Sequence, residues 1–519
     1  MTGRTYPVAR GAPLAAVPDL PSLMIDWVTG AASLVGATAE WRTCLESPSP
    51  STPAPAWSDT AWRDAWWDDF AADLPDDEAV SICRSNVAAL AAGAADVIVT
   101  GQQPGFLGGP LYTLYKAAAC IAAAEARSAA GRPTVPLFWS GDDDDDLREA
   151  FAPRLYDPRR RAILRPVAPI PAASLSVGAL PASLAGAGEA AWLAERAAHE
   201  PLARRLAGIW QSAIAGRQTW GRLHRRALLL LFGRSGMLAL SGGDARLHAA
   251  AAPLYARILQ DEAGLAARAA QRGDRLVADG YHAQIAEGSL ARPFSVAVDG
   301  QRRRLGDKNA RPSDPASLRP GVLFRSPVQD WLFRPAGVVV GPGELSYLKQ
   351  TEPVYEALEM PRPPLVPRLF CTLTQDAAAG SRSDAPVHGA ASAAALTRVD
   401  GVAAESLTDV LRETFGLTAA EARDVAAPNL KRWSARNSAL FDRLAGTGDG
   451  PDGRPAWVAP GARRQERVLA MHWATALWGE TLTDAVLAAA QAHLASGAAG
   501  EWADWRIVVG AAGSERNET

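Results

Sequence analysis

Residues 97–139 constrain the fold more than any other part of the chain. An apolar run at 97–99 is typical of a strand, and a glycine-rich loop follows it. A helical stretch from Pro110 to about Ala129 then leads to a second apolar strand at 135–139. Strand, helix and strand in this order form a βαβ unit, so the segment predicts a parallel sheet in an α/β fold.

The same pattern continues along the chain. We expect the region before residue 96 to be mostly helical. Further strands are expected at 237–240, 294–298, 337–340 and 505–509, and further helices at 192–227, at 247–270 and from Leu345. Asp299-Gly300 offers a two-residue turn after the strand at 294–298, which predicts a hairpin there.

The C-terminal third divides differently. Residues 374–400 are rich in alanine, serine and glycine and predict a flexible linker between a core at 1–373 and an arm at 401–456. A 3-4-3-4 spacing favours one amphipathic surface helix over a short coiled coil; it joins Leu430, Trp433, Asn437, Leu440 and Leu444. Residues 457–519 are predicted to be a helical segment that returns to the core.

Composition excludes several classes of protein. The formal net charge is −3, from 53 basic and 56 acidic residues, so no global field favours nucleic acid or an acidic membrane. The four cysteines form no C-x-x-C pair, which is consistent with a reducing cytoplasm. The first residues lack the apolar stretch of a signal peptide, and the longest apolar run is too short to span a bilayer.

The loop after the first strand is the first candidate site. Thr100, Gly101, Gln102 and Gln103 open it, and Gly108, Gly109, Tyr112 and Lys116 follow before or within the next helix. Exposed N–H groups and the helix dipole would favour an anion here, and Lys116 could reach a phosphate or carboxylate. The alternative is a turn whose glycines are needed only for packing. The loop is neither a P-loop nor a dinucleotide fingerprint.

An acidic run, Asp142–Asp146, directly follows the second strand. Ligands of open α/β sheets bind at the carboxyl ends of strands. Five adjacent carboxylates repel one another, so raised pKa values or a bound cation are expected, and Mg²⁺ would suit an ATP-dependent enzyme. The alternative is a solvated loop, or N-cap residues for a helix that starts at Leu147.

A second strand, glycine turn and helix occur at 338–347. Gly341, Gly343, Glu344 and Tyr347 belong to it, and Arg325, Gln329 and Asp330 lie shortly before it. Arg325 is either a fork for a carboxylate or an ordinary surface arginine, and the helix dipole alone could explain Glu344. The seven histidines show no metal-binding spacing, so no metal ligands are assigned.

These segments together resemble the bacillithiol biosynthesis cysteine-adding enzymes, the BshC family. The stretch from Val99 to Lys116 is similar to the family's TGQQ signature, and the resemblance continues through 136–139 and the acidic run. It resumes at 280–284, is strongest over 324–374, and returns at the Gln465-Glu466-Arg467-Val468 stretch.

The resemblance implies a Rossmann-like parallel-sheet core and a helical coiled-coil arm that supports a homodimer. It also implies a ligase that adds cysteine to glucosaminyl-malate to give bacillithiol, driven by a nucleotide that we expect to be ATP. The cytoplasmic location is expected from the cysteines, and Mg²⁺ is a candidate ion because of the acidic run. On this basis Asp143, Asp144, Asp146 and Lys116 are the candidate catalytic residues. The candidate substrate- and nucleotide-binding residues are Thr100, Gly101, Gln102, Gln103, Gly108, Gly109, Tyr112, Arg325, Gln329, Asp330, Gly341, Gly343, Glu344 and Tyr347.

Two departures from the family pattern keep a second hypothesis open. The family's E-D-H-D motif corresponds to Asp143–Asp146 here, so Asp145 replaces a histidine and cannot act as a neutral imidazole. The arm at 401–456 is shortened, which weakens the case for a dimer. The second hypothesis is therefore a non-catalytic relative that binds a nucleotide or thiol metabolite as a scaffold or regulator.

Overall fold

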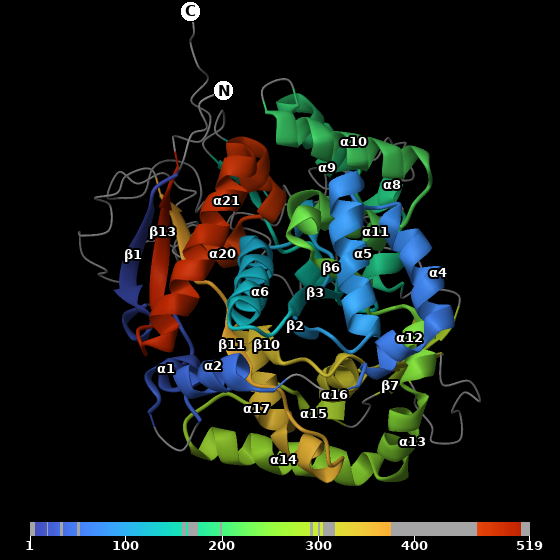
Figure 1. Ribbon diagram of the computed structural model, residues 1–519, viewed down its shortest axis with the longest axis vertical. Coiled ribbons are helices and arrows are strands. Elements are labelled where there is room, and N and C mark those ends of the chain that lie inside the picture. The colour runs from blue at the N-terminus through green and yellow to red at the C-terminus, as the bar shows by residue number, and fades with distance from the viewer. Residues whose placement is uncertain are drawn as a thin grey trace, which may run out of the picture.

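The computed structural model of the chain describes residues 6–17, 19–31, 35–48, 52–157, 162–164, 175–197, 200–290, 294–298, 301–304, 317–374 and 464–509. In this part of the chain, helices surround a central parallel sheet, and smaller sheets lie beside it (Figure 1). The predicted arm at 401–456 and all but the first residue of the predicted linker lie outside the described residues.

Five parallel strands form the central sheet in the order β11-β10-β2-β3-β6. Their bounds are β2 Asp96–Gln102, β3 Thr134–Ser140, β6 Leu238–Ser241, β10 Gly337–Val340 and β11 Leu365–Pro367. The chain builds outward from β2 through β3 to β6, then returns to the other side of β2 for β10 and β11. Doubly wound sheets bind ligands at such a reversal, outside the carboxyl ends of the strands. The sheet confirms the predicted Rossmann-like α/β fold class.

Two long helices cover one part of this sheet in successive layers. α6 (Leu111–Ala129) packs on β2, β3 and β10, and α21 (Met471–Ala498) packs on α6 (Figure 1). Nearly every side of α6 is buried, including alanines 117–119 and 122–124. Small side chains allow helices and strands to approach closely, so this alanine-rich sequence suits a helix enclosed on both sides.

The remaining described helices surround the sheet. They are α1 Ser22–Thr29, α2 Ala37–Glu46, α3 Pro55–Ser58, α4 Thr60–Ala71, α5 Asp77–Ala91, α7 Leu147–Ala150, α8 Ala182–Ala185, α9 Ala187–Arg196, α10 Pro201–Ala215, α11 Trp220–Phe232, α12 Ala245–Ala250, α13 Ala252–Gln260, α14 Glu262–Ala278, α15 Glu287–Leu290, α16 Val322–Phe333, α17 Pro342–Ala357 and α20 Gln465–Val468. The predicted helical stretch at 192–227 therefore consists of several helices, and α17 begins before the predicted Leu345.

Three smaller sheets complete the described part. β1 (Val8–Pro13) and β12 (Cys371–Thr374) flank β13 (Ala503–Val508), so the first and last described strands pair with each other. β4 (Leu155–Asp157) pairs with β5 (Ala162–Leu164). β7 (Phe294–Val298) pairs with β8 (Gln301–Arg304) and β9 (Leu318–Pro320), which confirms the predicted hairpin. The prediction of a mostly helical N-terminal region missed β1.

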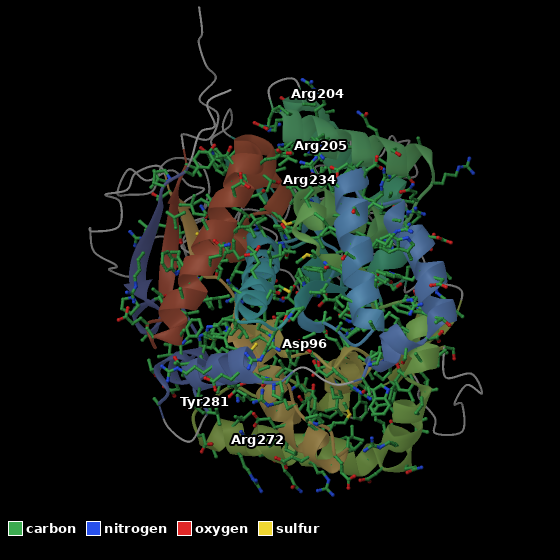
Figure 2. The ribbon with its side chains drawn as sticks, viewed as in Figure 1. Asp96, Arg204, Arg205, Arg234, Arg272 and Tyr281 are labelled. Atoms are coloured by element: carbon green, nitrogen blue, oxygen red, sulfur yellow. The ribbon has the colours of Figure 1, made fainter. Side chains whose placement is uncertain are left out.

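Buried ion pairs hold the amino edge of the central sheet. Asp96 lies at the start of β2 (Figure 2). It pairs with Arg127 near the end of α6, and both side chains are fully buried. Arg127 also donates to the carbonyl of Cys44 in α2. Glu40 of α2 accepts from the backbone N–H of Leu365 at 2.6 Å. These contacts tie α2 and α6 to the strand starts.

No helix among the described residues is long and apolar enough to cross a bilayer.

All four cysteines are buried and free. Burial raises the pKa of the Cys44, Cys83 and Cys120 thiols to about 12 and holds that of Cys371 well above its usual value. A thiolate is the nucleophilic form, so none of the four has the surroundings of a reactive cysteine.

Candidate active site

Two adjoining cavities open at the carboxyl edge of the central sheet. The larger cavity has a volume of about 420 Å³ and lies beside the ends of β2, β3 and β6. The smaller cavity has a volume of about 180 Å³ and lies between β2, β10, α16 and α17. Gln102 and Gln103 line both cavities, so the loop after β2 forms their common wall.

The smaller cavity gathers most of the predicted binding residues from three separate segments. β2 and the loop after it contribute Gly101, Gln102 and Gln103, and the acidic run contributes Asp144. The region from α16 to α17 contributes Arg325, Gln329, Asp330, Glu344 and Tyr347. The cavity therefore lies at the reversal of strand order between β2 and β10, where ligand binding is expected in this class of sheet.

The guanidinium of Arg325 contacts carboxylates of the acidic run. It donates to Asp144 at 2.9 Å and lies 3.8 Å from Asp143. The two carboxylates raise the pKa of Arg325 although burial opposes this. The sequence left open whether Arg325 binds a carboxylate or is an ordinary surface arginine, and the structure matches neither alternative alone. Arg325 pairs with two carboxylates of the acidic run and also lines the smaller cavity.

Lys116 lies behind the common wall of the two cavities and is almost fully buried. Its ammonium pairs with Glu344 of α17 at 2.7 Å and donates to the carbonyl of Gly101 and to Oε1 of Gln102. Gln102 in turn donates to Glu149 at 3.1 Å. Lys116 therefore joins the two glycine turns and fixes the Gln102 side chain.

The contacts of the first glycine turn favour the packing alternative over the expected anion cradle. The N–H of Leu107 donates to Glu189, those of Gly108 and Gly109 donate to the carbonyl of Gly105, and that of Leu111 donates to the carbonyl of Leu469. These backbone donors are already used within the protein. The packing alternative holds for Gly108: its φ is +86°, and an added Cβ would lie 2.5 Å from the ring of His472.

The second glycine turn is also closed to an anion. The carboxylate of Glu344 accepts from the N–H of Gly341 at 2.9 Å, as in a capping box at the start of α17. The same carboxylate binds Lys116. Glu344 thus occupies the position that an anionic ligand would take at this helix start.

Members of the acidic run have different surroundings. Asp144 accepts from the N–H groups of the next two residues, and Asp146 caps α7 by accepting from Glu149. The N-cap alternative is therefore correct for Asp146, which is exposed. Asp143 is buried and lines the larger cavity. Asp145 is exposed and lines neither cavity.

Asp142 is half-buried and also lines the larger cavity, yet it was not among the predicted site residues. Its Oδ1 accepts from the N–H of Gly243 at 2.9 Å, and Gly178 and Gly221 pack directly against it. Burial raises the pKa of Asp142 to about 6, and hydrogen bonds from Ser241 and Gly243 oppose that shift. The sequence signal was available, because Asp142 opens the run at the end of β3.

Several buried polar atoms of the larger cavity have no hydrogen-bond partner among the described residues. They are both amide atoms of Gln103, Oγ1 of Thr113 and Nε2 of His224. Thr113 is within the TGQQ signature but was not selected, and His224 was assigned a structural role. Burial holds the pKa of His224 well below its usual value, so the ring is neutral near neutral pH.

The other predicted residues lie outside both cavities. Thr100 donates to the carbonyl of Val339 at 3.1 Å and joins β2 to β10. Gly109, Tyr112, Gly341 and Gly343 also line neither cavity. Among the described residues, no group of three or more His, Cys, Asp or Glu side chains is placed to hold a metal ion.

Residues 74–313 and 308–369 match the profile described as "Bacillithiol biosynthesis BshC, N-terminal Rossmann-like domain". These segments span more than half of the chain. The chain belongs to the BshC family. The cavities described above are formed largely by residues inside the matched segments of this BshC-family chain.

Individual relatives agree with the family match. The chain is 29% identical over 315 residues to a protein of Shouchella clausii and 27% identical over 308 residues to one of Koribacter versatilis, both named "Putative cysteine ligase BshC". Each match covers 56% of this chain. The chain spans 57% of the length of these curated relatives.

Proposed function

We propose that this BshC-family chain is a carbon–nitrogen ligase that joins the carboxyl group of cysteine to the amine of glucosaminyl-malate in the last step of bacillithiol biosynthesis. The family match supports a role in this pathway, and the names of the relatives support a cysteine ligase. The observation that carries the proposal is the smaller cavity, where the TGQQ loop, the acidic run and α16–α17 converge.

The smaller cavity suits a small zwitterion such as cysteine. Arg325 donates to Asp144 through one terminal nitrogen and leaves its Nε without a partner among the described residues, so it can still donate to a carboxylate. Asp144 and Glu344 line the same cavity and place negative charge near an ammonium group, although each is already paired with a cation of the protein. Gln102, held by Lys116 and Glu149, presents a fixed amide at the boundary of the two cavities. Rate enhancement would come from holding two substrates in contact and from fixed dipoles near the reacting carbonyl.

The use of ATP remains a prediction, because neither glycine turn forms a phosphate site in the described residues. Backbone donors at the first glycine turn are used internally, His472 fills the space beside Gly108, and Glu344 caps α17. These residues do not fit a triphosphate at either turn, so no step is derived through ATP. Mg²⁺ likewise remains a prediction, since it prefers one or two carboxylates together with phosphate oxygens.

The non-catalytic alternative rests on Asp145, which replaces the family's histidine. Asp145 is exposed and lines neither cavity, so its replacement removes no group from either one. This observation favours the ligase over the scaffold.

We also propose a cytoplasmic location, in keeping with four free, buried cysteines. The predicted homodimer depends on residues 401–456, outside the described residues, and stays a prediction.

The test is a ligation assay with the purified full-length chain, cysteine and glucosaminyl-malate. Mass spectrometry should detect bacillithiol when ATP is present, and omission of ATP or addition of a chelator tests the nucleotide and the ion. Arg325→Met should lower the yield strongly, whereas Asp145→His should leave it close to wild type. If the Asp145→His variant forms product and the wild type does not, the natural chain is non-catalytic. If neither protein forms product, the ligase proposal is refuted.

A further inference from the structure

Glu189 is a fully buried acidic residue of α9 that lines neither cavity. We propose that Glu189 is a positioning residue for the ligation, because it holds the loop Gly105–Gly109 in place through the N–H of Leu107. Through this loop it fixes Gln102 and Gln103 at the common wall of the two cavities. The proposal rests on the proposed ligase function, since it assigns a further residue to that reaction.

The loop Gly105–Gly109 has a backbone that must be held by its surroundings. Leu107, Gly108 and Gly109 follow one another with positive φ angles of +46°, +86° and +89°. Glycine adopts this region readily, whereas a residue with a branched side chain such as Leu107 adopts it only where neighbouring groups enforce it. Residues in such conformations cluster at active sites. The acceptor of the Leu107 N–H therefore helps to decide whether the loop keeps its shape.

Glu189 is that acceptor, although it lies 82 residues further along the chain. Its Oε1 accepts from the N–H of Leu107, and its Oε2 accepts from the indole N–H of Trp210 in α10. α9 and α10 pack against each other, and both contact α21 (Figure 1). The carboxyl group is thus fixed in direction by one helix while it holds the loop from another.

The surroundings of Glu189 disfavour its charge. Trp210 packs edge-on against His224 and His472, and burial holds the pKa of His224 well below its usual value and lowers that of His472 to about 3. These rings are therefore neutral and supply no positive charge. Burial raises the pKa of Glu189 to about 8, and the hydrogen bonds from Leu107 and Trp210 oppose that shift. A carboxyl group kept where burial disfavours its charge is a frequent feature of functional sites.

The far end of the loop is held separately. The carbonyl of Gly109 accepts from the N–H of Met471 at 2.8 Å, and the N–H of Leu111 donates to the carbonyl of Leu469 at 2.6 Å. These contacts fix the start of α6, whereas the middle of the loop contacts Glu189. Loss of the Glu189 contact should therefore shift the loop on the side of the cavities and leave α6 in place.

The loop is continuous with Gln102 and Gln103, which line both cavities. Gln102 presents its amide where the two substrates would meet, and a displacement of about 1 Å at a reacting group can lower a rate about a hundredfold. Arg325 and Asp144, the groups proposed to face cysteine, lie on other segments of the chain. A shifted loop should therefore lower kcat and leave the KM for cysteine nearly unchanged.

Steady-state kinetics of the full-length chain with cysteine, glucosaminyl-malate and ATP test this role. Glu189→Leu fills similar space without an acceptor, and it should lower kcat at least about tenfold while the KM for cysteine changes less than about threefold. The double variant Glu189→Gln with Trp210→Phe keeps an amide oxygen for Leu107 and removes the indole N–H that the amide NH₂ group would otherwise face. It should restore kcat to within about threefold of wild type.

Two controls separate this contact from general packing. Trp210→Phe alone retains the Leu107 contact and should lower kcat by at most about threefold. Glu195→Gln changes a residue of the same helix whose side chain is 51% exposed, and it should leave kcat unchanged. Thermal unfolding confirms that each variant is folded at the assay temperature. If Glu189→Leu fails to fold, Glu189→Gln replaces it, and its loss of kcat should be reversed by adding Trp210→Phe.

Three kinetic results would overturn the proposal. They are a wild-type kcat in Glu189→Leu, a loss of kcat that the double variant does not restore, and an equal loss in Trp210→Phe alone. The second result would mean that Glu189 acts by filling space, and the third that it acts through α10.

Hydrogen–deuterium exchange separates this role from the ligase itself, because it requires no turnover. Mass spectrometry of peptides that cover residues 105–110 should show exchange at least about tenfold faster in Glu189→Leu than in wild type, and recovery in the double variant. This pattern in an inactive wild type would retain the contact and refute the ligase. Unchanged exchange would overturn the proposal, and faster exchange with an unchanged kcat would do so while the ligase stands.

Discussion

Both edges of the central sheet carry buried ion pairs, but at the carboxyl edge further polar side chains are buried without a partner among the described residues. At the amino edge, Asp96 forms an ion pair with Arg127, and Glu40 forms ion pairs with Lys349 and Arg362. At the carboxyl edge, the Asp142 carboxylate accepts from the N–H of Gly243 and forms no ion pair among the described residues, and Gln103 and Thr113 have unpaired side-chain atoms. Paired groups hold the fold together, whereas unpaired ones indicate where a ligand binds.

The largest expected effect comes from breaking the pair at the amino edge. Asp96→Ala leaves the guanidinium of Arg127 buried without its carboxylate, and the loss of one partner of a buried ion pair costs about 3–5 kcal/mol of unfolding free energy. Urea unfolding measures this loss. The double variant Asp96→Ala with Arg127→Met should recover part of it, and a loss below about 1 kcal/mol would show that the pair does not stabilise the fold.

Gly108→Ala tests how closely the loop is packed. The new Cβ would collide with His472 at a φ of +86°, and we expect a loss of about 1–3 kcal/mol of unfolding free energy. Gly280→Ala is the control, because its φ is +85° and nothing lies within 4 Å of the added Cβ. Equal losses in the two variants would mean that His472 imposes no steric cost beyond the backbone conformation.

Asp142→Asn should have an effect on stability that depends on pH. The folded-state pKa of Asp142 is raised from 3.8 to about 6, so the folded protein holds this proton more tightly than the unfolded chain. The wild type therefore loses stability as pH rises from about 4 to 6. Asparagine can still accept from Gly243 and carries no charge. The variant should be more stable than wild type above pH 6 by on the order of 1–2 kcal/mol, and equal to it below pH 4.

Urea unfolding at pH 4 and pH 8 measures this difference. Asp146→Asn is the control, since asparagine and aspartate cap a helix start about equally well. An Asp142→Asn variant less stable than wild type at pH 8 would show that the ionised carboxylate is stabilising.

The smallest effects compare two threonines. Thr100→Val removes a hydroxyl that donates to Val339, at an expected cost of about 1 kcal/mol. Thr113→Val removes a buried hydroxyl without a partner and should cost less than about 0.5 kcal/mol, or add stability. Denaturant midpoints of the two variants give the comparison. A larger loss for Thr113→Val would show that its hydroxyl contributes to the fold.

The central parallel sheet could be predicted from the sequence because the patterns that indicate its strands and helix are local. The apolar runs of β2, β3 and β10, with Pro110 before α6, determined the parallel sheet without knowledge of distant contacts. The contacts that decide the site are not local. Nothing near Leu107 indicates that Glu189 accepts its N–H, or that Leu469 and His472 fill the space beside the loop.

The same limit explains the missed residues. The run of five aspartates suggested chemistry, but only the fold shows that Asp142 faces the larger cavity while Asp146 caps a helix. β1 was missed because its partner β13 is almost the full chain length away. The predicted division at residues 374–400 stays a prediction.

The layering of α21 on α6 has a consequence for synthesis. Residues 130–470 leave the ribosome between these two helices. At roughly 5–20 residues per second, the apolar outer surface of α6 waits for its cover on the order of tens of seconds. The nascent chain is therefore exposed to aggregation during translation, and a chaperone that shields α6 until α21 emerges would raise the yield of folded protein.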